Sequence, residues 1–267
     1  MAVWFVTGAA RGIGHEVARE ALRRGHRVVA TGRDLTTVTA AFAGAIGEVL
    51  PLELDHSHPE PAVEQAMRRF GRIDVVVHDA ARTARAPLRE TTDAQARALF
   101  DANVVGMLAV TRAVLPVLTA QQTGWIIAVG SAAGFSTPAG SGLYDATMAA
   151  VEALCEALCE ALRAELDDTG VCTTVVELGR FSMLPAAFDR GPLPPGDPRK
   201  AAAAIVDLLD VDDPPLRLQL GADAVARVEA KLERVAQELD QWRPVSLSTG
   251  ADEYLPGQNG HRPTEDM

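Results

Sequence analysis

The chain has 267 residues and a formal net charge of −11, and strand-like and helix-like segments alternate along it without a break in composition. This pattern favours one large α/β domain over two small ones. The sequence has no block rich in Lys and Arg, which argues against a nucleic-acid-binding protein. It also shows no signal peptide and no long apolar run, so we expect a cytoplasmic protein with no membrane partner.

Seven short segments are apolar throughout, as strands buried on both faces of a parallel sheet are. In chain order they are Val3–Thr7, Arg27–Thr31, Val49–Leu54, Ile73–Val77, Trp125–Val129, Val171–Val176 and Leu216–Leu220. Helical patterns separate them. The alternation predicts a Rossmann-type, doubly wound α/β fold of about seven strands with helices on both faces.

The helical patterns include one near each end of the chain. Helices are predicted over Gly12–Arg24, Ala146–Leu166, Arg199–Leu209 and Ala224–Gln241. Residues 179–198 are rich in Pro, Gly and isolated apolar residues, a pattern too irregular to predict a helix or a strand. We interpret this segment as a lid. Residues 243–267 are polar and are predicted to be a frayed tail, leaving 1–242 as one domain.

The cysteines and histidines do not indicate a metal centre. Cys155, Cys159 and Cys172 are few and odd in number, which favours reduced thiols over a disulfide framework. His56, His58 and His78 follow two predicted strands, where solvated or strand-end histidines are favoured over ligands. We therefore predict no metal site.

A glycine-rich turn joins the first strand to the first helix. Residues 7–14 read Thr-Gly-Ala-Ala-Arg-Gly-Ile-Gly, and a plain strand-to-helix turn is the alternative interpretation. A dinucleotide-binding fold places a pyrophosphate against helix amides at this point. We predict that Gly8, Arg11, Gly12, Ile13 and Gly14 bind this group. The glycine spacing resembles that of the short-chain dehydrogenase/reductase family.

The end of the second strand bears on the choice of nicotinamide cofactor. NAD-selective sites carry a carboxylate there for the ribose 2′-hydroxyl, whereas this chain has Thr31-Gly32-Arg33. Arg33 and Arg11 would face a 2′-phosphate, which favours NADP. Asp34 leaves NAD open, and an ordinary solvated charge is the alternative interpretation of Arg33.

The resemblance extends from about Val3 to Trp242 and implies further cofactor contacts. Asp55 matches the position that meets the adenine, although it also suits a strand-end turn. Residues 78–81 read His-Asp-Ala-Ala where the family has Asn-Asn-Ala-Gly, so Ala80 matches a cofactor contact and the next residue adds a methyl group. Gly179 matches the glycine of the family's Pro-Gly near the nicotinamide.

Three of the four catalytic positions that the family implies are retained. Ser131 matches the serine that hydrogen-bonds the substrate oxygen, Tyr144 the general acid/base, and Asn103 the residue that positions a relay water. Met148 stands where the family has the lysine that lowers the tyrosine pKa and holds the nicotinamide ribose. A core residue or an engineered replacement are alternative interpretations of Met148.

The missing lysine separates three hypotheses of function. A free phenol has a pKa of roughly 10, so Tyr144 is a poor base for oxidation but can still donate a proton during reduction. The first hypothesis is an NADPH-dependent reductase of hydrophobic ketones or aldehydes. The others are a non-redox enzyme of the same fold and a catalytically silent nucleotide-binding protein. Relatives form dimers or tetramers through the Ala146–Leu166 helix, so we expect a homo-oligomer.

Overall fold

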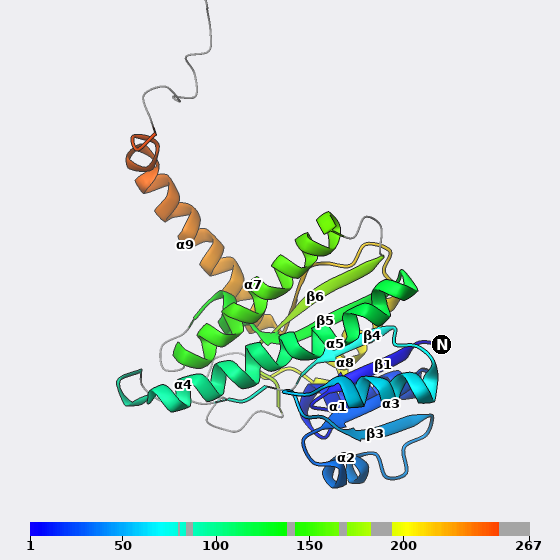
Figure 1. Cartoon of the computed structure of the whole chain (residues 1–267). Helices are drawn as coiled ribbons and strands as arrows, with labels where there is room; N and C mark the ends of the chain where they lie inside the picture. The colour runs from blue at the N-terminus through cyan, green and yellow to red at the C-terminus, as the bar shows by residue number, and fades with distance from the viewer. Residues whose placement is uncertain (80, 84–87, 138–141, 166–169, 183–193, 251–267) are drawn as a thin grey trace, which may run out of the picture. The chain divides into compact units, whose positions relative to one another are not determined.

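One parallel sheet organises the chain, as predicted (Figure 1). The computed structural model describes residues 1–79, 81–83, 88–137, 142–165, 170–182 and 194–250. The strands are β1 (Val3–Thr7), β2 (Arg27–Gly32), β3 (Val49–Glu53), β4 (Val75–His78), β5 (Gly124–Ser131), β6 (Val171–Leu178) and β7 (Arg217–Leu220). Their order, β3-β2-β1-β4-β5-β6-β7, reverses direction between β1 and β4, which is the switch point where such folds bind ligands.

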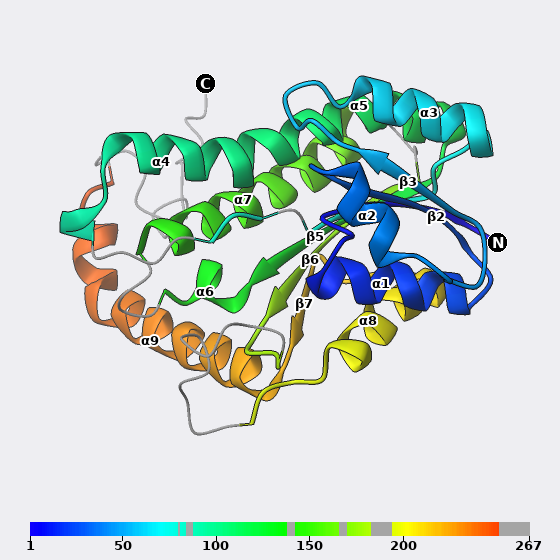
Figure 2. The same ribbon diagram turned by 90° about the horizontal axis from the view of Figure 1, so that it is seen from below.

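Helices cover both faces of the sheet, which confirms the doubly wound architecture. The α-helices are α1 (Gly12–Arg23), α2 (Leu35–Ala41), α3 (Glu60–Phe70), α4 (Asp93–Phe100), α5 (Gly106–Gln121), α6 (Ala132–Phe135), α7 (Gly142–Glu165), α8 (Pro198–Asp207) and α9 (Ala222–Leu247). Short 3₁₀ helices are η1 (Leu88–Glu90) and η4 (Leu208–Asp210), and η2 (Asp101–Val105) is a π-helix. Figure 2 shows α1 and α8 across the sheet from α3 and α5.

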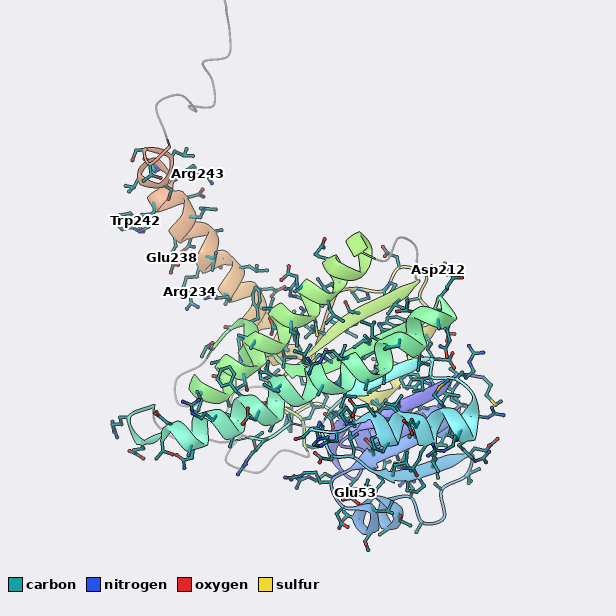
Figure 3. The ribbon with its side chains drawn as sticks, viewed as in Figure 1. Glu53, Asp212, Arg234, Glu238, Trp242 and Arg243 are labelled. Atoms are coloured by element: carbon teal, nitrogen blue, oxygen red, sulfur yellow. The ribbon has the colours of Figure 1, made fainter. Side chains whose placement is uncertain are left out.

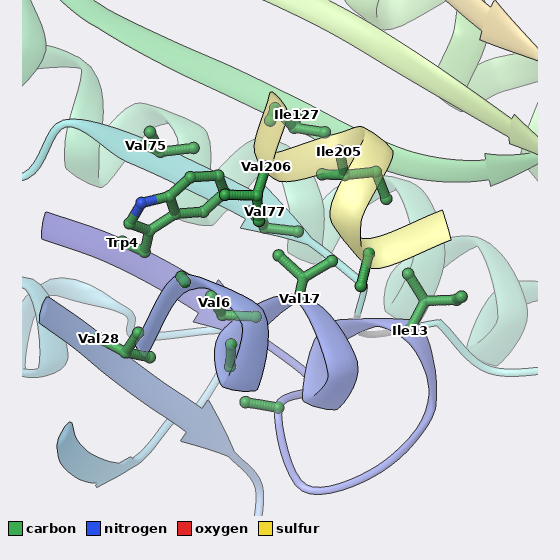
Figure 4. Close-up of a cluster of buried hydrophobic side chains, with 14 of the residues drawn as sticks. Trp4, Val6, Ile13, Val17, Val28, Val75, Val77, Ile127, Ile205 and Val206 are labelled. Atoms are coloured by element: carbon green, nitrogen blue, oxygen red, sulfur yellow. The ribbon is translucent and has the colours of Figure 1, made fainter. Parts of the chain in front are cut away.

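The apolar strands explain the two faces, because successive side chains of a strand point to opposite sides. Trp4 and Val6 of β1 pack with residues of α1 and α8 in one buried cluster (Figure 4). Val3 and Phe5 lie in a second cluster with residues of α3 and α5. The first strand therefore contributes to two cores, one on each face of the sheet.

One helical run, Asp93–Gln121, is long and apolar enough to cross a membrane by length and composition alone. It comprises α4, η2 and α5. Val110, Val114 and Leu118 of α5 are fully buried in the second core cluster. This burial is typical of a core helix in an α/β protein.

The last helix is longer than the sequence pattern indicates. Residues 243–247, which the sequence assigns to the tail, continue α9 as far as Leu247. Pro244 has no N–H to donate within the helix, but its carbonyl oxygen still accepts the Ser248 N–H. The chain divides into two compact units, Met1–Val228 and Glu229–Met267.

Candidate active site

The glycine turn has the backbone shape of a phosphate-binding loop. Gly8 and Gly12 have φ angles of 67° and 75°, in the left-handed region that favours glycine. A Cβ at Gly14 would lie 2.8 Å from Asp79 Oδ2 and 3.1 Å from the Thr7 carbonyl oxygen. The first turn of α1 therefore packs tightly against the ends of β1 and β4.

The first turn of α1 fits an anionic ligand. It contains no acidic residue, and Arg11 at its N-cap makes no side-chain capping bond to the amides. Exposed Arg11 adds positive charge, whereas the Ile13 side chain is buried in the core and leaves only its backbone to meet a ligand. Helix amides that lack an internal partner attract phosphate. The residues present thus suit the pyrophosphate of a dinucleotide.

Asp79 is a functional candidate that sequence reasoning did not select. Its Oδ2 accepts the Gly14 N–H at 2.7 Å, so a carboxyl group lies directly against the glycine turn. Burial raises the pKa of Asp79 to about 7, although the Gly14 amide and Arg11 oppose the shift. The family pattern has a neutral asparagine here, and that departure was the available signal.

Two charged residues, Arg33 and Asp34, follow the end of β2, and they lie in different environments. Arg33 is exposed and forms no ion pair with any residue that the structure describes. Asp34 caps α2: its carboxylate accepts the N–H groups of Thr36 and Thr37 and the Thr37 hydroxyl. These bonds, above all that from the Thr37 hydroxyl, lower the pKa of Asp34. The Asp34 carboxylate is therefore hydrogen-bonded to the first turn of α2.

Asp55 has a local structural role in this conformation. It lies just beyond β3, is exposed, and its Oδ1 accepts the Ser57 N–H at 2.8 Å. His58 Nδ1 lies 3.5 Å from the same carboxylate. The arrangement is the strand-end turn that the sequence left open as an alternative.

Gly179 allows a close approach between the end of β6 and the start of α9. A Cβ there would lie 2.2 Å from Asp223 Oδ1, and the Arg180 N–H donates to the Asp223 carboxylate. Phe181, counted with the lid, is instead buried in the core cluster against Gly196. Of the predicted lid, 179–198, positions 183–193 lie outside the described residues, as does Ala80, and Pro198 begins α8.

Three of the four predicted catalytic residues lie at the end of β5 and on α7, with only α6 between these two elements. Ser131 ends β5 and caps α6, and its Oγ accepts the Ala133 N–H at 3.2 Å. Tyr144 and Met148 are four residues apart on α7 and share a helix face. Met148 is buried with Val151, and Tyr144 packs against the same apolar cluster.

Asn103 sits in the π-helix η2, and such wide turns recur at functional sites. Its Oδ1 accepts the Arg82 N–H at 2.7 Å, and its Nδ2 donates to the Arg82 carbonyl at 3.0 Å. Nδ2 also donates to Thr147 Oγ1 at 2.9 Å, and the Thr147 hydroxyl donates to the Tyr144 carbonyl. Thr147 thus connects Asn103 to the Tyr144 turn of α7.

A small cavity of about 20 Å³ is lined by several of these segments. Its lining residues are Thr7, His56, His78, Asp79, Ala81, Asn103, Met107, Ala128, Val129, Met148 and Val151. A cavity of this size accommodates one water molecule. The fold therefore brings Asn103 and Met148 together with the ends of β1 and β4, whereas Arg33 and Asp55 lie at the ends of β2 and β3.

Two histidines of this cavity are held neutral. Burial, with a smaller contribution from nearby His56, lowers the pKa of His78 to about 3, and His78 Nε2 lies 3.1 Å from Thr111 Oγ1. Burial also lowers the pKa of His56. Among the described residues, no group of three His, Cys, Asp or Glu side chains gathers to hold a metal ion.

Comparisons with known proteins identify the family. A model described as short chain dehydrogenase matches residues 2–183. An oxidoreductase of Botryotinia fuckeliana is 29% identical, over 92% of this chain and 98% of that protein. An uncharacterized oxidoreductase of Staphylococcus saprophyticus is 32% identical, over 75% of this chain and 88% of that protein.

Solved structures agree with these sequence matches. A short-chain dehydrogenase from Streptomyces avermitilis is 33% identical with a TM-score of 0.82, covering 94% of this chain and 98% of that one. An alcohol dehydrogenase from Thermococcus sibiricus, complexed with 5-hydroxy-NADP, shares the fold with a TM-score of 0.72 at 23% identity, covering 82% and 96%. Because the family model spans more than half of its length, the chain belongs to the short-chain dehydrogenase family.

Proposed function

We propose that this protein is an NADPH-dependent reductase of ketones or aldehydes, in which Tyr144 works without a cationic partner. One observation carries the proposal. Of the described residues that line the cavity beside Met148, none is cationic at neutral pH, because desolvation lowers the pKa of buried His78 and of half-buried His56. Asn103 and Met148 nevertheless share that cavity with Thr7 of the glycine turn.

The chain's own residues support reduction better than oxidation. When bound, NADPH supplies the hydride that a carbonyl carbon accepts. Tyr144 donates its phenolic proton to the carbonyl oxygen, giving an alcohol, and recovers a proton from solvent. Ser131 accepts the Ala133 N–H, so its hydroxyl hydrogen can be donated to the same substrate oxygen. Oxidation instead requires a phenolate, which Met148 does not stabilise.

The charges at the end of β2 support NADPH over NADH. Arg11 and Arg33 are exposed, and Asp34 is bonded to α2. The related archaeal structure in complex with 5-hydroxy-NADP is consistent with this choice. We expect Arg33→Ala to weaken NADPH binding by about tenfold with little effect on NADH, measured by titration calorimetry. Arg68→Ala, an exposed arginine on α3, is the control.

The substrate that we propose is an apolar carbonyl compound. The sequence of residues 179–198 supplies apolar side chains near Gly179, although Phe181 is committed to the core. A panel of aliphatic and aromatic ketones and aldehydes, followed by NADPH absorbance, tests this. Turnover of polar sugars alone would contradict it.

The decisive variant is Met148→Lys, because it restores the cation that the family's chemistry uses. We expect alcohol oxidation to rise by about tenfold to a hundredfold, with a smaller gain in reduction. Met148→Leu, which preserves apolar volume, should give no gain, and Tyr144→Phe should abolish both directions. Failure of the purified protein to bind NADPH or NADH in calorimetry would refute the proposed function.

A further inference from the structure

The helix α9 carries an apolar stripe on its surface. Six of its large apolar side chains are between 43% and 57% exposed, and five of them form the stripe: Val225, Leu232, Val235, Leu239 and Trp242. With Val228 they repeat at alternating steps of three and four residues, which is the spacing of the seam of a coiled coil. A face of this kind gains free energy when it is covered.

The charges of α9 argue against a membrane as the partner that covers its apolar stripe. Its charged residues are Asp223, Arg227, Glu229, Lys231, Glu233, Arg234, Glu238, Asp240 and Arg243, with five acids against four bases. Interfacial helices that bind anionic lipid carry an excess of Lys and Arg on the polar face. Figure 3 shows Arg234, Glu238, Trp242 and Arg243 along this helix. Mixed charge beside an apolar seam is instead typical of paired helices.

The sizes of the seam residues suit an antiparallel pair of identical helices. When Leu232 is placed opposite Val235 of a second copy, Val228 meets Leu239 and Val225 meets Trp242. Each layer then combines a smaller with a larger side chain. A parallel pair would instead stack Trp242 on Trp242 and Val225 on Val225.

The charges that flank the seam favour the same arrangement. In the antiparallel register Lys231 of each helix faces Glu238 of the other, giving two equivalent ion pairs. Neither residue forms an ion pair with any other residue in the described part of the chain. The parallel arrangement would use Arg243, which already binds Asp240 of its own helix at 2.7 Å.

We propose that α9 is a self-association surface, which forms an antiparallel two-stranded coiled coil with α9 of a second copy of this chain. The stripe spans about two and a half heptads, fewer than the roughly three to four of an independent coiled coil. Association is therefore concentration dependent and sensitive to salt.

Charge reversal tests the pairing and its direction in sedimentation velocity at low salt. Lys231→Glu and Glu238→Lys, each alone, are expected to raise the dissociation constant by about tenfold, because each places like charges opposite one another. The double variant Lys231→Glu/Glu238→Lys is expected to restore wild-type association. An unchanged dissociation constant for Lys231→Glu would overturn the antiparallel pairing. So would restoration of the association of Glu238→Lys by Arg243→Glu but not by Lys231→Glu, because that result indicates a parallel pair.

Disruption of the seam tests the surface itself. The variant Leu232→Glu/Leu239→Glu is expected to lower the assembly mass of the full-length protein, because it removes the α9 contact between two copies. Ala230→Glu/Gln237→Glu adds two glutamates on the opposite side of α9 and is expected to leave the mass unchanged. Circular dichroism and thermal unfolding check that each variant is folded. Equal masses for wild type and the double seam variant would overturn the proposal.

Discussion

At the scale of single residues, the site is defined by two substitutions in the family pattern. Met148, which belongs to a buried apolar cluster, stands where the family resemblance implies a lysine. Asp79 places an ionisable carboxyl group where a neutral amide is usual, against the Gly14 amide. We propose that the first alters the chemistry, and we expect the second to make the charge beside the glycine turn depend on pH.

The pKa of Asp79 predicts how nucleotide affinity varies with pH. Because burial raises this pKa to about 7, Asp79 is largely neutral below pH 7 and becomes a carboxylate above it, where it repels a pyrophosphate. NADPH affinity should therefore fall between pH 6 and pH 8.5. Asp79→Asn keeps an acceptor for the Gly14 N–H and should bind NADPH about fivefold to tenfold more tightly at pH 8.5.

Titration calorimetry of both proteins across this pH range provides the measurement. The ratio of the two dissociation constants isolates Asp79, since the 2′-phosphate titrates equally in both experiments. A ratio that stays constant from pH 6 to pH 8.5 would show that Asp79 does not ionise near the bound nucleotide.

At the scale of elements, the short helix α6 is held against α7 by a glycine. A Cβ at Gly134 would lie 2.5 Å from Glu152 Oε1 and 2.8 Å from the Met148 carbonyl carbon. Ser131 caps α6, so the packing of α6 on α7 also fixes the position of Ser131 relative to Tyr144.

Gly134→Ala should separate α6 from α7. We expect a loss of about 1–3 kcal/mol in the free energy of unfolding and a lower kcat, because Ser131 moves with α6. Gly130→Ala is a matched control in the preceding strand, where the added Cβ would be 3.6 Å from its nearest neighbour. Chemical denaturation and steady-state kinetics measure both effects, and equal behaviour of the two variants would contradict the packing argument.

The strands and the first helix could be predicted closely because their residues carry local signals. β1 matches its predicted bounds, since five apolar or small residues precede a glycine turn. The π-helix at Asn103 could not be predicted, because α4 before it has only eight residues and one buried residue, too few to reveal a shift in apolar periodicity. The cavity between His56 and Met148 could not be predicted either, because it depends on packing between segments that are distant in the sequence.

At the scale of the whole molecule, the excess of acidic over basic residues includes carboxyl groups that are buried in the interior. Glu152 and Glu177 are buried near Arg217, and Glu177 Oε1 lies 3.8 Å from Arg217 Nε. Burial and the proximity of Glu177 raise the pKa of Glu152 to about 7. Burial also raises the pKa of Glu177.

This pair predicts a molecule that loses stability on the alkaline side. A carboxyl group whose pKa is raised on folding stabilises the folded state fully below pH 4.5, and this contribution is lost as the pH rises through 7. Glu152→Gln should flatten the dependence and raise Tm at pH 8 by roughly 2–4 °C, or about 1 kcal/mol. Calorimetric scans at pH 5 and pH 8 measure it. Parallel curves for the two proteins would exclude Glu152 as the cause.

The wide turn η2 also constrains how the gene of this protein can vary in length. Removing one residue from 101–105 would restore an ordinary helix but rotate α4 by about 100° relative to α5. Asn103 would then lose either Arg82 or Thr147 as a partner. Single-codon deletions should therefore be tolerated at the exposed start of α4 and eliminated within these five positions.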